Sequence, residues 1–154
     1  MTEVERIADQ LRRAHEGEAW HGPALRELLP GVKAAQAAAR PVAAAHSIWE
    51  IVRHIGVWEA VGRRRLSGEV IGDLPPEQDW PAVTDTSEAA WLKTLKDLED
   101  GHQQLQQTIA RLSDRQLAEP VPVQGYTIYF LLHGLVQHAL YHAGQIAVLK
   151  KAAS

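Results

Sequence analysis

The sequence predicts an all-α protein, built as a four-helix bundle. Four long segments carry apolar residues at the three- and four-residue spacing that lines one face of a helix, and no segment alternates as a strand does. The chain has 154 residues, which suffices for one domain with a real core but not for two ordinary ones. We therefore expect residues 1–154 to form a single domain.

The composition excludes several classes of function. A net charge of −3 and the lack of a long basic run give no reason to expect nucleic acid or an anionic membrane as a partner. Cysteine is absent, so any metal must be held by His, Asp or Glu. The polar N-terminus does not resemble a signal peptide, and we expect a cytoplasmic protein.

The first half of the chain contains two main helices, each with a capping box. The first begins at Thr2-x-x-Glu5 and ends near Gly17, and a short helix and an Ala-rich link lead on to Pro41. The second begins at Ser47-x-x-Glu50 and ends at about Leu66. Its apolar stripe consists of Ile48, Ile51, Val52, Ile55 and Trp58.

A linker of nearly twenty residues, about 67–85, separates the second helix from the third. It is long for adjacent antiparallel helices but can cross the length of a bundle, which would leave these two helices parallel. The third helix, about 86–112, carries its core residues at strict four-three spacing: Trp91, Leu95, Leu98, His102, Leu105, Ile109 and Leu112.

Thr127 is expected to cap the last helix, 128–151, whose flank carries the small residues Ala139, Ala143 and Ala147. A line of small residues suits the close approach of another helix, and on this basis we expect a homodimer. The uncharged stretch 120–149 is as long as a membrane span, but the histidines and glutamines inside it argue against insertion.

Two histidines one turn apart, His138 and His142, lie within the most apolar face of this last helix. Buried imidazoles are costly unless something satisfies them, and two of them at this spacing can point nitrogens at a common metal ion. The alternative is a pair of core histidines bonded to neighbouring protein groups. The spacing alone is a weak motif, and its place in the apolar stripe is what favours a metal.

A catalytic metal usually takes three protein ligands and leaves a position open. His54, at the edge of the second helix's stripe, and His102, near the centre of the third helix's seam, are both candidates for the third ligand, and periodicity does not separate them. His15 and His46 lie near helix ends, where we expect them to be solvated. Neither the Glu of a His-Glu-x-x-His protease nor the ligand set of a di-iron bundle is present, which leaves a mononuclear site.

Two blocks of the chain resemble signatures of the DinB/YfiT-like metalloenzymes of the DinB superfamily. The second-helix signature resembles Ser47-Ile-Trp-Glu-Ile-Val-Arg-His54-Ile, with Trp58-Glu59 and Arg65-Leu-Ser-Gly68-Glu after it. The last-helix signature resembles Leu132-His-Gly-Leu-Val-Gln-His138-Ala-Leu-Tyr-His142-Ala-Gly-Gln145-Ile. The order and spacing of both blocks fit, and the resemblance covers nearly the whole chain.

This resemblance implies an up-down-down-up four-helix bundle, in agreement with the long linker. It also implies a divalent ion, nickel or zinc, held by His54, His138 and His142, so that it favours His54 over His102. Homodimers are common in the family. Characterised relatives include transferases and isomerases that use low-molecular-weight thiols, and many other members have no known reaction.

We expect a metal-dependent enzyme acting on a small molecule, as a thiol-dependent S-transferase or as a hydrolase. Its cleft is expected to be lined by Trp58, Tyr141 and Gln145. Trp58 follows His54 by one turn, and Gln145 follows His142 by nearly one turn. One alternative is a non-catalytic, stress-associated bundle whose metal site is closed by a fourth ligand such as His102. Another is a histidine cluster that holds no metal.

Overall fold

The computed structural model of the chain describes residues 1–153, which fold as an all-helical protein without a β-strand. Its four long helices are α1 (Glu3–Glu16), α4 (Ile48–Leu66), α6 (Glu88–Ile109) and α7 (Ile128–Ala152). The connections contain α2 (Leu25–Leu28), α3 (Ala34–Ala38), α5 (Pro76–Asp79) and the 3-10 helix η1 (Asp114–Ala118). The predicted all-α class is confirmed, with four long helices.

The capping residues explain where the long helices begin. Thr2 Oγ1 accepts a hydrogen bond from the Glu5 amide at 3.2 Å, and the Glu5 carboxylate accepts one from the Thr2 amide at 2.7 Å. Ser47 and Glu50 make the same reciprocal pair at the start of α4, at 3.1 and 2.7 Å. These contacts satisfy amides that have no partner inside the helix.

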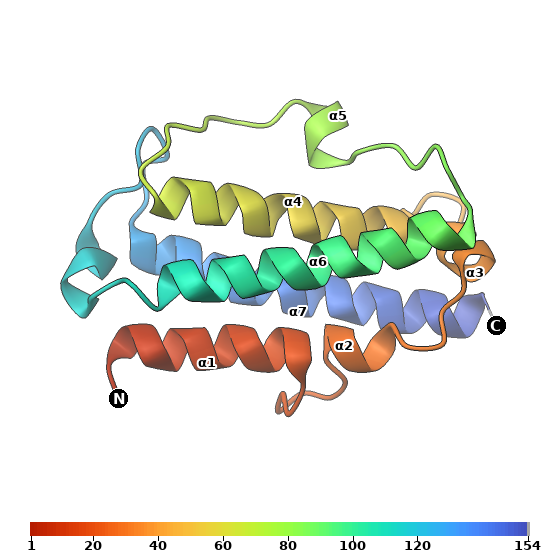
Figure 1. Cartoon of the computed structure of the whole chain (residues 1–154), viewed down its shortest axis with the longest axis horizontal. Helices are drawn as coiled ribbons and strands as arrows, with labels where there is room; N and C mark the ends of the chain where they lie inside the picture. The colour runs from red at the N-terminus through yellow and green to blue at the C-terminus, as the bar shows by residue number, and fades with distance from the viewer. Residues whose placement is uncertain (154) are drawn as a thin grey trace.

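The long helices lie side by side along one axis (Figure 1). Helices α4 and α6 run in the same direction, whereas α1 and α7 run the opposite way. After α4 the chain crosses the bundle over the outer side of α4, through α5, before α6 begins at the far end. The linker is therefore long because it returns the chain to the end at which α4 started, and it lays α5 over the middle of α4.

The core forms two clusters along the bundle axis. One surrounds the tilted aromatic pair of Trp49 and Trp91, whose ring centroids lie 5.1 Å apart. The other lies where α1 meets α6 and α7, and contains Leu11, Leu105 and Leu132. Between α4 and α7 the approach is close: a Cβ added at Gly62 would lie 2.8 Å from Leu135 Cδ1.

Two details differ from the sequence-based expectations. Ala139 and Ala143 are buried within the core of the same chain, so this part of the alanine line packs intramolecularly instead of forming a free face. Helix α6 also begins at Glu88 and ends at Ile109, within the predicted 86–112. None of the helices in residues 1–153 is long and apolar enough to cross a membrane.

Candidate metal centre

Three histidine side chains from two helices meet between α4 and α7. His54 Nε2 lies 3.0 Å from His138 Nε2, which lies 3.1 Å from His142 Nε2. His54 and His142 are only 6% and 5% exposed, whereas His138 is half-buried. The antiparallel packing of α4 on α7 thus brings together the three residues that the family resemblance implied.

The other ring nitrogen of two of these histidines is bonded to a protein oxygen. His54 Nδ1 donates to the Asp79 carbonyl oxygen at 2.8 Å, and His142 Nδ1 donates to Gln145 Oε1 at 2.7 Å. Both oxygens can only accept, so the proton of each neutral ring is on Nδ1. The Nε2 lone pairs of His54 and His142 therefore both face His138.

This arrangement fits a divalent cation. A single proton on His138 Nε2 can bond one of its two neighbours but not both, which leaves a lone pair directed at the centre without a partner. Two imidazole ligands of a tetrahedral zinc ion, with bonds of about 2.0–2.1 Å, lie about 3.3 Å apart, close to the 3.0 and 3.1 Å separations here. The donor set suits zinc and nickel alike.

The protonation of the three histidines agrees with this fit. Burial, together with the neighbouring His142 and His54, lowers the pKa of His138 to about 3. Burial also lowers the pKa values of His54 and His142, against the opposing effects of Asp79 and Gln145. All three rings are consequently neutral near pH 7, which is the form that binds a metal.

The crossing linker supplies two residues that the sequence analysis did not identify. Besides its carbonyl contact, Asp79 places Oδ1 3.1 Å from His54 Nδ1 and accepts a hydrogen bond from Trp58 Nε1 at 2.7 Å. Trp80 stacks on His54, with ring centroids 3.7 Å apart and planes 3° apart. No helical periodicity marks a linker residue, and the length of the linker was the only available signal.

The three residues predicted to line one cleft lie in different surroundings. Tyr141, which is 67% exposed, and Gln145 line a cavity of about 620 Å³ beyond His142 along α7. Trp58 lines a separate cavity of about 160 Å³ together with His138. The histidine cluster is therefore flanked by two cavities, and Trp58 belongs to one while Tyr141 and Gln145 belong to the other.

The remaining histidines correct one expectation. His15 is not solvated: it is 2% exposed, because the last turn of α1 packs against α6. His46 is half-buried and stacks on Trp80 with ring centroids 3.5 Å apart. His102 is fully buried, but it lies with His15 and Glu59 and not with the three histidines.

Comparison with known proteins agrees with the resemblance found in the sequence. Residues 19–146, which include α4, the linker and all three histidines, match the DinB superfamily. No curated protein and no solved structure matches the chain significantly. Since the matched segment covers most of the chain, the protein belongs to the DinB superfamily.

Proposed function

We propose that this protein is a metal-dependent enzyme that acts on a small molecule at a mononuclear site formed by His54, His138 and His142. The observation that carries the proposal is the convergence of three neutral Nε2 atoms at 3.0 and 3.1 Å. A divalent ion held there supplies a Lewis acid that lowers the pKa of a bound water or thiol. Zinc and nickel are the candidate ions.

The chain's own residues hold this donor set in place. Asp79 and Gln145 fix the tautomers of His54 and His142, and outer contacts of this kind orient metal-binding rings. Trp80 covers one face of His54. His138, the least buried of the three, borders the smaller cavity, and this is the side from which we propose that substrate reaches the site.

The proposal rests on helices α4 and α7 being antiparallel neighbours, as in an up-down-down-up four-helix bundle. Two packing observations support this path. Trp49 and Trp91, which lie near the first turns of α4 and α6, pack together, as parallel helices require. Gly62, near the end of α4, meets Leu135, in the first half of α7, as antiparallel helices require.

We propose a thiol-dependent S-transferase or a hydrolase as the reaction class. The smaller cavity beside His138 is lined mainly by apolar side chains such as Phe130, Leu131 and Leu135, which suits an uncharged organic group. The chain has no cysteine, so a thiol nucleophile must arrive as a small co-substrate. We place this chemistry in the cytoplasm, where thiols are kept reduced.

A non-catalytic metal-binding bundle is the second candidate, and it predicts a site closed by a fourth protein ligand. His102 was the expected fourth ligand, and in the described residues it belongs to another cluster. Asp79, the carboxylate nearest His54, already accepts a hydrogen bond from Trp58 Nε1 through Oδ1. These observations favour a site with an open position.

Metal analysis of protein purified without an affinity tag tests the site. His138→Ala is expected to bind one equivalent of zinc or nickel fewer than the wild type, whereas His21→Ala, a change at an exposed histidine, retains the wild-type stoichiometry. Equal metal content in wild type and His138→Ala would refute the ligand assignment.

The reaction class is tested with the metal-loaded protein and two substrate panels. One panel combines small thiols with alkyl and epoxide electrophiles, and the other contains esters and amides. A thiol that perturbs the visible spectrum of the cobalt-substituted protein supports the transferase. Turnover of an ester without thiol supports the hydrolase. If no compound in either panel reacts, the non-catalytic candidate is favoured.

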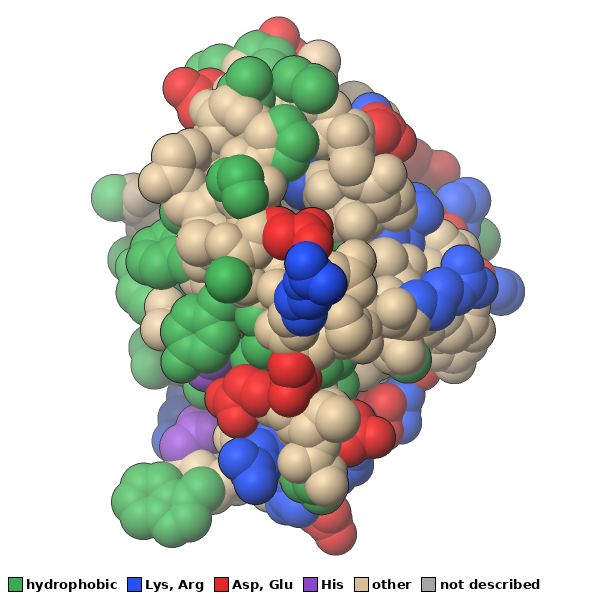
Figure 2. Space-filling model, turned by 90° about the vertical axis from the view of Figure 1, so that its left-hand side faces the viewer, with side chains coloured by type: hydrophobic (Ala, Val, Ile, Leu, Met, Phe, Trp, Pro, Cys, Tyr) green, Lys and Arg blue, Asp and Glu red, His purple; other side chains and the backbone are tan. Residues whose placement is uncertain are grey.

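The predicted homodimer was placed on the alanine line, which is largely buried. Helix α7 nevertheless exposes apolar side chains, at Tyr129, Phe130, Tyr141 and Val148. Viewed from the end at which α1 begins, the molecule gathers hydrophobic side chains along one edge, while charges of both signs intersperse elsewhere (Figure 2). We propose this exposed side of α7 as the surface to examine if sedimentation detects a dimer.

A further inference from the structure

A second cluster of potential ligands lies in the bundle core, on a different face of α4. His15 from α1, Glu59 from α4 and His102 from α6 are 2%, 3% and 0% exposed. One ligand atom from each residue lies within 4.8 Å of the others. Glu59 follows His54 by five residues, which places it about 140° around the helix and about 7.5 Å along it. The two clusters are therefore separate.

The polar atoms of this cluster have no hydrogen-bond partner among the described residues. Both nitrogens of His15 and of His102 and both carboxylate oxygens of Glu59 are buried and unpaired. The approach of His102 Nδ1 to Glu59 Oε1, at 3.6 Å, is longer than a hydrogen bond. Buried polar groups are nearly always satisfied, so six such atoms in one place indicate that a bound species is missing.

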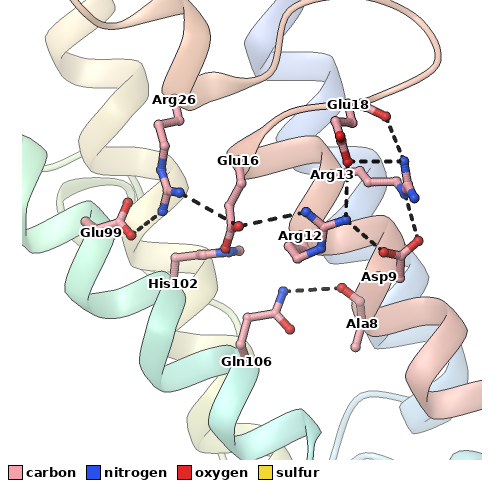
Figure 3. A network of polar contacts seen from close by, with 10 residues as sticks. All are labelled: Ala8, Asp9, Arg12, Arg13, Glu16, Glu18, Arg26, Glu99, His102 and Gln106. Atoms are coloured by element: carbon pink, nitrogen blue, oxygen red, sulfur yellow. Dashed lines mark hydrogen bonds and ion pairs between the residues drawn. The ribbon is translucent and has the colours of Figure 1, made fainter.

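The surrounding charges distinguish Glu59 from the other nearby carboxylate. Glu16 Oε1 lies 3.5 Å from His102 Nε2, and its other oxygen faces the guanidinium groups of Arg26 at 3.7 Å and Arg12 at 3.9 Å. Figure 3 shows Glu16 between these two arginines, above the side chain of His102. Glu16 is thus neutralised by arginines, whereas Glu59 forms no ion pair with an arginine or lysine among the described residues and approaches only the His102 ring, at 3.6 Å.

We propose that His15, Glu59 and His102 form a second, structural site for a divalent transition-metal ion such as zinc. Two imidazoles and one carboxylate are a common zinc donor set. Such an ion would satisfy one atom of each residue, stabilise the carboxylate form of Glu59 and tie α1 to α4 and α6. Since α1 precedes the segment that matches the DinB superfamily, residues 19–146, the match does not cover His15.

Binding at this site requires a side-chain rearrangement. The rings of His15 and His102 are stacked, with centroids 3.7 Å apart and planes 9° apart, so one ion cannot lie in both ring planes. At least one ring must turn about its Cβ–Cγ bond, while the helices remain where they are. A cavity of about 190 Å³ that is lined by His15, Arg26 and Glu99 gives the ion a route from the surface.

The test is zinc stoichiometry of the full chain, measured by titration after chelator treatment. The wild type is expected to bind two equivalents. His102→Gln and the isosteric Glu59→Gln are expected to bind one, and His138→Ala is also expected to bind one. Combining His138→Ala with Glu59→Gln is expected to leave none. The control Gln106→Ala, one turn beyond His102 in α6, retains both equivalents.

A second readout keeps the proposal testable if His102→Gln folds poorly. His15→Phe keeps an aromatic ring for stacking but removes the ligand, so it is expected to fold, to bind one equivalent and to lose the zinc-induced change in the His102 ring-proton NMR shifts. One equivalent in the wild type and none in His138→Ala would overturn this proposal and leave the three-histidine site intact. The reverse pattern, one equivalent lost only with Glu59→Gln, would overturn the first site alone.

Discussion

Asp79 offers the sharpest test of how the three-histidine site is held. Replacing it with alanine removes the carboxylate, which lies 3.1 Å from His54 Nδ1 and accepts from Trp58. The backbone carbonyl of residue 79, which fixes the tautomer of His54 at 2.8 Å, remains. Loss of an outer contact typically weakens metal binding about 10–100-fold. Because the stronger of the two contacts survives, we expect the lower end, about tenfold or about 1.4 kcal/mol.

Asp79→Asn separates geometry from charge. The amide oxygen can still accept a hydrogen bond from Trp58, so the Trp58 ring keeps its orientation. Only the negative charge beside His54 is lost. We expect a weakening smaller than that of Asp79→Ala. The affinity is measured by competition with a zinc-binding dye, and Glu77→Ala, an exposed change in the same helix α5, is the control. An Asp79→Ala affinity within twofold of wild type, or as low as that of His54→Ala, would show that this reasoning is wrong.

Three further predictions concern other parts of the structure. Gln145→Leu removes the acceptor for His142 Nδ1 and is expected to weaken zinc binding about tenfold, measured by the same competition, while the exposed Tyr141→Ala is neutral. Burial, together with His102 and Arg26, lowers the pKa of His15 from its ordinary 6.5 to about 3. Between these two pH values the unfolded chain binds a proton at His15 that the folded chain does not bind. The metal-free fold therefore loses stability as the pH falls. The contribution of His15 to this loss at pH 5 is about 2 kcal/mol, and His138 and its neighbours add their own. Urea unfolding with chelator at pH 7 and 5 is therefore expected to show a loss in the wild type that exceeds the loss in His15→Phe by about 2 kcal/mol. Gly62→Ala places a methyl group against Leu135 and is expected to destabilise the wild type. In the Leu135→Ala background the same change is expected to stabilise the protein by up to about 1 kcal/mol, because alanine favours the helix and the clash is gone. A double-mutant cycle measured by thermal melting tests both expectations.

The helices could be predicted from sequence because their signals are local. Each capping pair, Thr2–Glu5 and Ser47–Glu50, lies within four consecutive residues, and both pairs form as expected. The linker length correctly indicated that the chain must cross the bundle between α4 and α6. It did not indicate α5, because a helix of four residues has too few positions to show a period.

The site could be predicted only in part, because only some of its signals are local in the sequence. The spacing of His138 and His142 on one helix face is local and was sufficient to group them. The choice between His54 and His102 depends on which helix faces α7 at that level, and this is a property of packing that periodicity does not contain. The family resemblance implied His54, and the structure brings His54 to the pair.

The expectation for His15 failed because a position near a helix end does not determine burial. The end of α1 lies beside the middle of α6, where His102 occupies the seam, so His15 is enclosed by a neighbouring helix and not by its own. Helix α4 then presents polar ligands on two faces, His54 toward α7 and Glu59 toward α6. Since burial alone makes such groups destabilising, their placement on α4 supports the two metal sites that we propose.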